Sequence, residues 1–367
     1  MKILYITPKI NNEGGVARVL SVKTNYLIEN LGYNIGIITQ NDGNSNPFFN
    51  FNATISKFDI SLDRKKIQFI FDYKKQVEQV IASFQPDIIV VCDNGIKGFL
   101  FSKIIKTKIP VVLEIHGSKF NEVTNFSRNF LNKITRNLKY RFKNYCVSKF
   151  KYVVALSKES ASEWNIENSI IIPNPIDVTN GILSNLTSKK AIVVSRNSYE
   201  KGVDRLLPIW KKVTEIHTDW ILEIYGIHSN DKQLSEIISS LELSSNVILH
   251  QPTKNIQEKY VQSSMYLMTS RTEGFPMVLL EAMNFGLPCI AYDCPIGPRA
   301  VIQNNENGFL VEDGNIAAFA EKIMALINDS EQRKLLGNNA KKSVLKYNID
   351  AIMLQWKTLF ESIKTTV

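Results

Sequence analysis

The sequence has few of the residues that build metal centres and disulfide frameworks. Its 367 residues include four cysteines and four histidines, scattered along the chain, with no Cys-x-x-Cys pair and no Asp-x-Asp. Long apolar runs are missing too, since stretches such as DIIVVC (87–92) are far too short to cross a bilayer. The N-terminal MKILYITPKI has no long apolar core or small-residue cleavage site. These absences argue against a zinc or disulfide framework, a membrane-spanning helix and a signal peptide, and they favour a cytoplasmic protein with reduced thiols.

Positive charge is present in excess, but only in the first half of the chain. The formal net charge is +9. Residues 1–173 carry 24 Lys and Arg against 14 Asp and Glu, whereas residues 174–367 carry 20 against 21. This asymmetry predicts an anionic partner for the first half, and a phosphate-bearing substrate, a lipid surface or a nucleic acid would each fit.

Short β-branched segments alternate with helical patterns in both halves of the chain. Runs of this kind, bounded by loops, are typical of parallel strands that are buried on both faces. They are KILYIT (2–7), NIGIIT (34–39), DIIVVC (87–92), PVVLEI (110–115) and YVVALS (152–157), then AIVVSR (191–196), WILEIYG (220–226), VILHQ (247–251), MYLMTS (265–270) and PCIAYD (288–293). The pattern predicts an α/β fold of two doubly wound parallel-sheet domains in tandem.

The boundary between the two domains is expected near SIIIPNPIDVTNG (169–181), where Pro, Asn and Gly follow a strand. We expect an N-terminal domain of residues 1–173 and a second domain of residues 174–349. An amphipathic helix at about 350–367 completes the chain. Since ligands bind beyond the carboxyl ends of parallel strands, a substrate cleft between the domains is the expected site.

Two glutamates, Glu273 and Glu281, frame the stretch EGFPMVLLEAM (273–283). Pro276 suits a first helical turn, so a helix is expected from about Pro276 to Phe285, with its positive end at the strand-end crevice. That end would attract phosphate, and a carboxylate there can accept hydrogen bonds from vicinal hydroxyls. The spacing alone is equally consistent with the alternative, a pair of solvated glutamates.

Two cations follow a predicted strand in SRNSYEKG (195–202). Arg196 and Lys201 over one crevice would neutralise a diphosphate, although solvated loop cations are the alternative. Gly14 and Gly15 follow the first strand and would let backbone approach a ligand, but an ordinary strand-to-helix turn also uses such glycines. There is no G-x-G-x-x-G, which disfavours NAD binding.

His116 and the basic segment after it lie in the first half. His116 closes the strand PVVLEI, where a lone histidine is more often structural than functional. Residues 118–151 hold nine Lys and Arg against one Glu, with apolar residues recurring at helical spacing. This pattern suits an anionic membrane surface. A domain helix with a solvated basic face and a nucleic-acid surface are the alternatives.

Five motifs, in this order, together resemble the GT-B retaining glycosyltransferases of family 4. They are GGVARVL (14–20), IIPNPID (171–177), SRNSYEKGVDRLL (195–207), EGFPMVLLEAM (273–283), which matches the E-x7-E signature, and NGFLVEDGN (307–315). The resemblance spans essentially the whole chain. The chain departs from the family at Ser195, where Gly is usual, and at Ala17, where Glu is frequent.

The resemblance implies a GT-B fold of two Rossmann-like domains, with the last helix crossing back onto the N-terminal domain. It assigns Arg196 and Lys201 to the leaving diphosphate, Glu281 to the ribose, Glu273 to the transferred sugar and His116 to donor sugar or phosphate. No metal or other cofactor is expected. The implied catalytic residues are Arg196, Lys201, Glu273 and His116, and the implied donor-binding residues are Gly14, Gly15, Gly274, Phe275, Pro276, Met277 and Glu281.

The resemblance implies retaining transfer of a hexose or N-acetylhexosamine from a nucleotide-sugar, with a UDP-sugar preferred. The acceptor would be a glycan or lipid-linked molecule in bacterial surface polysaccharide or glycolipid synthesis, with the enzyme cytoplasmic or peripheral on the inner face of the membrane. A GDP-sugar (mannosyl) transferase is the alternative within the family. A GT-B epimerase is disfavoured by the E-x7-E pattern, and a basic nucleic-acid-binding protein lacks an RNP or helix-turn-helix motif.

Overall fold

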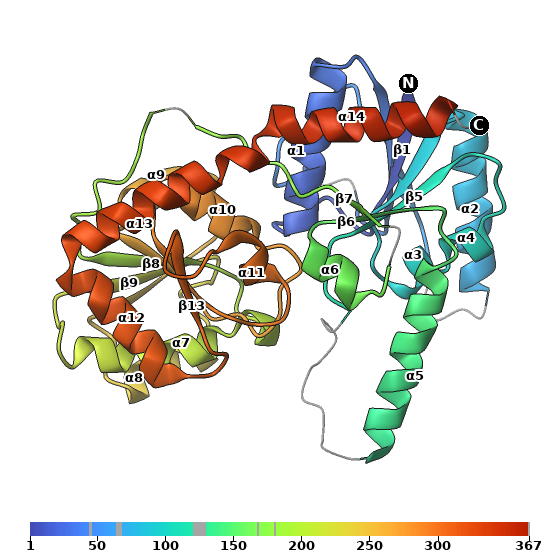
Figure 1. Ribbon diagram of the computed structural model, residues 1–367. Coiled ribbons are helices and arrows are strands. Elements are labelled where there is room, and N and C mark those ends of the chain that lie inside the picture. Colours follow the sequence, from blue (N-terminus) through green and yellow to red (C-terminus); the bar gives the residue numbers. More distant parts are fainter. Residues whose placement is uncertain (44–45, 64–67, 120–129, 167–168, 180, 366–367) are drawn as a thin grey trace. The chain divides into compact units, whose positions relative to one another are not determined.

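The computed structural model describes residues 1–43, 46–63, 68–119, 130–166, 169–179 and 181–365 (Figure 1). These residues form two compact units. The first contains the described residues up to Pro175 together with Ile349 onward, and the second contains Ile176–Asn348. Each unit has its own parallel sheet and its own hydrophobic core.

The first unit is built on a seven-stranded sheet with the order β3-β2-β1-β4-β5-β6-β7. Ile3 and Tyr5 of β1 face one core, whereas Leu4 and Ile6 face the other, so both sides of the sheet are covered. The strands are β1 (Lys2–Ile6), β2 (Asn34–Gln40), β3 (Ser56–Ile60), β4 (Ile88–Val91), β5 (Val111–Ile115), β6 (Tyr152–Ala155) and β7 (Ile170–Ile171). The helices are α1 (Gly15–Glu29), α2 (Phe69–Phe84), α3 (Ile96–Phe99), α4 (Phe101–Ile104), α5 (Phe130–Val147), α6 (Lys158–Glu163) and α14 (Ile349–Thr365).

The last helix, α14, packs in the first unit beside α1 (Figure 1). Its apolar face places Trp356 and Phe360 in the same core as Ile3. The Tyr26 hydroxyl of α1 donates a hydrogen bond to Asp350 Oδ1 at 2.8 Å. The chain therefore leaves the first unit after Pro175 and returns to it at Ile349.

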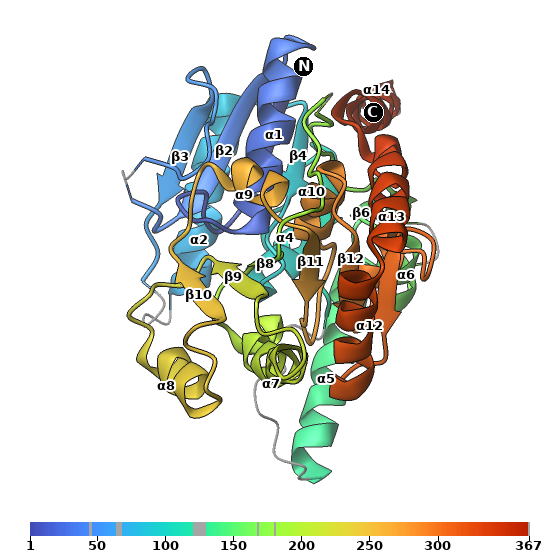
Figure 2. The ribbon, with the colours of Figure 1, turned by 90° about the vertical axis from the view of Figure 1, so that its left-hand side faces the viewer.

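The second unit repeats the architecture with six strands in the order β10-β9-β8-β11-β12-β13. Helices α7 and α12 lie side by side against one face of this sheet (Figure 2). The strands are β8 (Lys190–Val194), β9 (Ile221–Tyr225), β10 (Val247–His250), β11 (Met265–Met268), β12 (Cys289–Tyr292) and β13 (Gly308–Val311). The helices are α7 (Val203–Thr214), α8 (Lys232–Ser240), α9 (Ile256–Val261), α10 (Met277–Asn284), α11 (Gly297–Val301), α12 (Ile316–Asn328) and α13 (Ser330–Ser343), with 3₁₀ turns η1 (Tyr199–Lys201) and η2 (Leu345–Tyr347).

All strand pairs within the described residues are parallel, and the predicted α/β fold class is confirmed. The strand order reverses between β1 and β4 in the first unit and between β8 and β11 in the second. At such a switch point, the loops that leave the strands diverge and open a crevice for ligands. The candidate residues follow β1 and β5 in the first unit, and β8 and β11 in the second.

Candidate functional site

In the second unit, the loops after β8 and β11 bring together two of the predicted catalytic residues. Lys201 Nζ lies 2.8 Å from Glu273 Oε1, and the Ser270 hydroxyl donates to the same oxygen at 2.6 Å. Glu273 is only 7% exposed. A buried carboxylate that accepts a charge-assisted hydrogen bond is held in one orientation, so the ammonium and the carboxylate form a fixed pair at the strand ends.

The loop after β12 also packs against Glu273. Ile296 pairs with Glu273 in an isolated parallel bridge. A Cβ added to Gly297 would lie 2.5 Å from the Glu273 Cβ. Ile296 has φ 82° and ψ −73°, and the Gly297 N–H donates to the Pro295 carbonyl at 3.2 Å, which defines a classic γ-turn. This turn is strained for a β-branched residue, and such strain is found at ligand sites.

The predicted diphosphate ligand Arg196 lies apart from this pair. Its side chain is 62% exposed, and its guanidinium is 3.8 Å from Glu200 Oε1. No hydrogen bond or ion pair joins Arg196 to Glu273 within the described part of the chain. Arg196 follows β8 by two residues, so it stands at the same sheet edge as Lys201 but is turned to solvent.

Helix α10 begins one residue after Pro276, which takes the N-cap position. Glu281 inside it is 7% exposed and accepts a hydrogen bond from the Tyr260 hydroxyl at 3.2 Å. The alternative of two solvated glutamates is therefore wrong. Phe275 and Met277 are buried as well, whereas Gly274 is partly exposed. The stretch between the two glutamates is thus a packed turn that presents backbone at the start of α10.

In the first unit, His116 follows β5 and lies near a buried ion pair. Lys23 Nζ of α1 donates to both Glu114 oxygens at 2.6 and 2.7 Å. Nε2 of His116 is 3.4 Å from Glu114 Oε1. Burial raises the pKa of Glu114, but Lys23 and then His116 outweigh it and hold that pKa well below its usual value. The Lys23–Glu114 ion pair was not predicted from the sequence. The alternation of side chains in an extended chain would place residues 114 and 116 on one side.

The same cluster is the one group of described residues whose ligand atoms lie close enough to hold a metal ion. Atoms of Cys92, Glu114 and His116 lie within 4.8 Å of one another. However, the ammonium of Lys23 already bonds both carboxylate oxygens. Burial and then Glu114 raise the pKa of the Cys92 thiol, which disfavours the thiolate that metals require. The cluster therefore fits an internal lysine better than a metal.

Gly14 and Gly15 lie where β1 leads into α1. Gly14 is the N-cap with extended backbone, and its N–H donates to Asn12 Oδ1 at 2.7 Å. A Cβ at Gly15 would meet nothing within 4 Å. The first turn of α1 holds no acidic residue. Open space therefore adjoins the positive end of this helix, as a close approach of phosphate requires.

The basic segment 118–151 is partly described, because residues 120–129 lie outside the described residues. Within α5, Leu138, Phe142 and Tyr145 are exposed and share one helix face by their spacing. Lys139 and Arg141 are exposed nearby. Among the residues that the structure describes, no helix is both long and apolar enough to span a bilayer.

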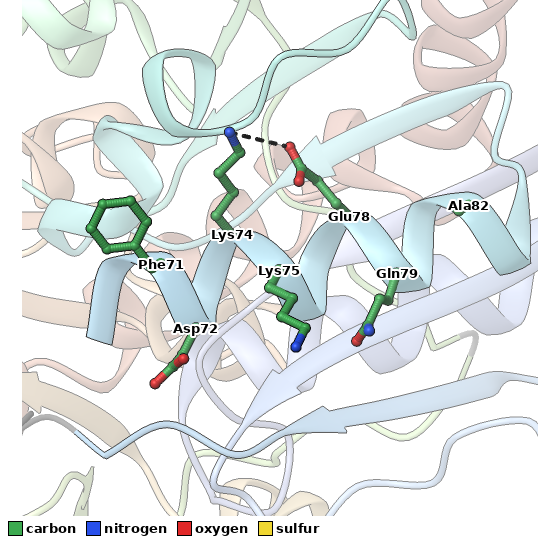
Figure 3. A pocket seen from close by; sticks show the side chains of 7 residues that line it. All are labelled: Phe71, Asp72, Lys74, Lys75, Glu78, Gln79 and Ala82. Atoms are coloured by element: carbon green, nitrogen blue, oxygen red, sulfur yellow. Dashed lines mark ion pairs between the residues drawn. The ribbon is translucent and has the colours of Figure 1, made fainter. Parts of the chain in front are cut away.

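A shallow hollow runs along the outer side of α2, and Figure 3 shows that its walls come from that one helix. Lys74 and Glu78, one helical turn apart, approach each other at 3.8 Å along the helix, and Phe71 stands exposed at one end. The hollow is an open strip on the helix surface. It brings none of the predicted site residues together.

Comparison with known proteins agrees with this architecture. The family model Glycosyltransferase Family 4 matches residues 13–180, and Glycosyl transferases group 1 matches residues 179–343. An uncharacterized glycosyltransferase of Haemophilus influenzae is 28% identical, covering 97% of this chain and 99% of that protein. The amylovoran biosynthesis glycosyltransferase AmsD of Erwinia amylovora is 27% identical, covering 98% and 99%.

A solved structure of Anabaena Alr3699/HepE in complex with UDP and glucose has the same fold. The TM-score is 0.77 with 18% sequence identity, covering 99% of this chain and all of the other. The two family matches follow each other along the chain and span both units. The protein is therefore a glycosyltransferase of GT-B architecture that belongs to family 4.

Proposed function

We propose that the protein is a retaining transferase that moves a hexose or N-acetylhexosamine from a UDP-sugar to a glycan or lipid-linked acceptor, in bacterial surface polysaccharide or glycolipid synthesis. The observation that carries the proposal is the Lys201–Glu273 pair, fixed at 2.8 Å at the switch point of the second sheet. The complexes of similar proteins with UDP support the choice of nucleotide.

In this proposal, an arriving diphosphate draws Lys201 Nζ from Glu273. Arg196, which is free to swing because it is exposed, joins Lys201 in stabilising the charge that grows on the leaving group. Glu273 then accepts hydrogen bonds from hydroxyls of the transferred sugar. Glu281, held by Tyr260, receives the ribose hydroxyls. No metal is needed, because the two cations supply the positive charge.

We propose front-side attack as the route to retention. The acceptor oxygen bonds to the anomeric carbon as the bond from that carbon to the phosphate oxygen breaks on the same face. The departing phosphate oxygen takes the acceptor proton. A double displacement would require a second carboxylate beside the sugar, about 5 Å from the first.

The nucleobase would lie against the loops 225–230 and 249–255. Tyr225 and His250 end the neighbouring strands β9 and β10, and their rings stack at 4.4 Å. Gly14, Gly15 and His116 of the first unit would contact the donor sugar or phosphate. The exposed apolar and basic residues of α5 would rest on an anionic membrane surface, at the cytoplasmic side of the cell membrane.

The test is release of nucleoside diphosphate from a panel of UDP- and GDP-sugars with excess EDTA, followed by assignment of the anomeric configuration of the product by NMR. We expect one UDP-sugar to be turned over with retention. If only a GDP-sugar were turned over, the protein would be the GDP-sugar (mannosyl) transferase of the alternative. An inverted product would refute the retaining mechanism, and activity only with added metal would refute metal independence.

A further inference from the structure

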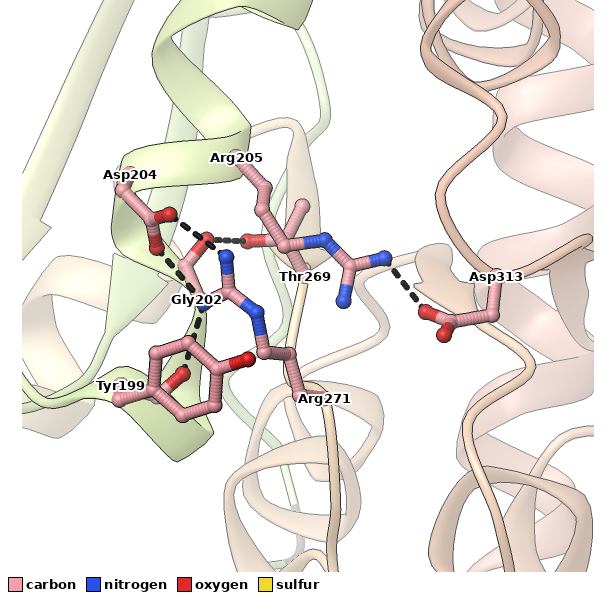
Figure 4. A network of polar contacts seen from close by, with 7 residues as sticks. All are labelled: Tyr199, Gly202, Asp204, Arg205, Thr269, Arg271 and Asp313. Atoms are coloured by element: carbon pink, nitrogen blue, oxygen red, sulfur yellow. Dashed lines mark hydrogen bonds and ion pairs between the residues drawn. The ribbon is translucent and has the colours of Figure 1, made fainter. Parts of the chain in front are cut away.

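A group of residues outside the predicted site fastens the loop after β8 to the loop after β11. At its centre, the Arg271 guanidinium makes a bidentate ion pair with Asp204, at 2.8 and 2.6 Å (Figure 4). It also donates to the Tyr199 carbonyl at 2.7 Å and lies over the Tyr199 ring at 4.2 Å. The Arg271 side chain, in the loop after β11, thus binds both η1 and the first turn of α7.

Two further hydrogen bonds join the same two loops. The Arg271 N–H donates to the Glu200 carbonyl at 2.8 Å, and the Thr269 hydroxyl donates to the Gly202 carbonyl at 2.8 Å. A Cβ at Gly202 would lie 2.2 Å from the Thr269 carbonyl oxygen, and Gly202 has φ 63°. We call the residues Tyr199, Glu200, Gly202, Asp204, Thr269 and Arg271 the loop clasp.

The loop clasp adjoins the two residues of the candidate site. Lys201 lies between clasp residues of the β8 loop, and Glu273 follows Arg271 by two residues in the other loop. Movement of either loop would therefore alter the Lys201–Glu273 distance. The side chains of Arg271 and Asp204 are 22% and 51% exposed. Their bidentate geometry fixes the orientation of the guanidinium relative to the first turn of α7.

We propose that Arg271 and Asp204 are positioning residues, which hold Lys201 where it meets the second phosphate of a nucleoside diphosphate. This inference rests on the proposed nucleotide-sugar site. It assigns no contact with substrate to Arg271. These contacts require a planar guanidinium, whose N–H donors point in fixed directions. A lysine ammonium could not hold both Asp204 oxygens and the Tyr199 carbonyl in the same arrangement.

The test measures affinities for UDP and UMP by calorimetry in the full-length protein. Arg271→Gln should weaken UDP binding about tenfold or more, because a misplaced Lys201 would lose its charge-assisted hydrogen bond to the second phosphate. UMP lacks the second phosphate, so its affinity should change little and the UDP-to-UMP affinity ratio should fall. Asp204→Asn should lower the ratio in the same direction, and Arg271→Lys should restore only part of it.

Lys211→Gln is the matched control. Lys211 lies in the last turn of the same helix, α7, and pairs with the exposed Glu242 at 2.9 Å. Its removal should leave the ratio unchanged. If the natural protein binds UDP but the UDP-to-UMP affinity ratio is unchanged in both the Arg271 and Asp204 variants, the positioning role is wrong and the proposed function stands. Failure of the natural protein to bind UDP, GDP or ADP would overturn the proposed function as well.

Discussion

Gly297→Ala should damage the donor site by displacing Glu273. The added Cβ would lie 2.5 Å from the Glu273 Cβ and 3.1 Å from Pro276 Cδ. Carbon atoms pack at roughly 3.5–4.0 Å, so the loop after β12 or the start of α10 must shift by about 1 Å. Neither obstacle is the far end of a flexible side chain. The overpacking should cost on the order of 1–3 kcal/mol of unfolding free energy.

The consequence for function follows from the same displacement. If Glu273 moves by about 1 Å, turnover of the donor should fall by up to roughly 10²-fold. Thermal unfolding, UDP-sugar turnover and UDP affinity would be measured together. The reasoning fails if the variant is destabilised while its turnover stays at the natural level.

Gly308→Ala provides the control for this experiment. Its Cβ would lie 2.5 Å from the Cys289 carbonyl oxygen, an equally close approach in the same unit. Both residues begin their strands, so this clash is at the opposite end of the sheet from Glu273. We expect a comparable loss of stability with turnover per folded molecule preserved.

Three further outcomes are expected. Glu114→Gln should lower the unfolding free energy by roughly 3–5 kcal/mol, because Lys23 would stay buried without its carboxylate, as chemical denaturation would show. The pKa of Glu114 is lower in the folded protein than in the unfolded chain, where it is about 4.3. The stability that Glu114 contributes is therefore present above about pH 4.3 and is lost as the pH falls from there toward the folded pKa. The variant should lack this loss of stability in acid. Leu138→Ser with Phe142→Ser should weaken sedimentation with anionic vesicles, whereas unchanged sedimentation would contradict the membrane surface. DNA or RNA should give no salt-sensitive gel shift at micromolar protein, and a steep salt dependence would revive the nucleic-acid alternative.

The sequence predicted the sheets because parallel strands buried on both faces are nearly continuous apolar runs, as DIIVVC and MYLMTS are. The resemblance to family 4 implied that Lys201 and Glu273 belong to one donor site. The structure brings them together because β8 and β11 are neighbouring strands, whose following loops leave the sheet at the same edge. Their direct contact depends on loop conformation, which residue types alone do not define. The solvent-facing orientation of Arg196 was not predictable for the same reason.

Other parts of the site were hidden because they join residues far apart in sequence. Asp204 lies inside the motif SRNSYEKGVDRLL, and Arg271 lies two residues before the motif EGFPMVLLEAM, but nothing in either segment indicates that the two residues pair. Lys23 appears as one cation on an amphipathic helix, but it is buried against Glu114 and lies over the Trp356 ring at 3.6 Å. Such pairings require the tertiary fold.

The central claim is that the strand-end loops of the second unit hold a nucleoside diphosphate. The most direct measurement is thermal stabilisation by UDP, GDP and ADP with excess EDTA, repeated on Arg196→Ala. Arg196 is exposed, so its removal should leave the unliganded melting temperature unchanged. A ligand that binds only the native state raises the melting temperature as ln(1 + [L]/Kd) increases. We predict a shift with UDP that survives EDTA and shrinks in the variant; no shift with any of the three nucleotides would contradict the claim.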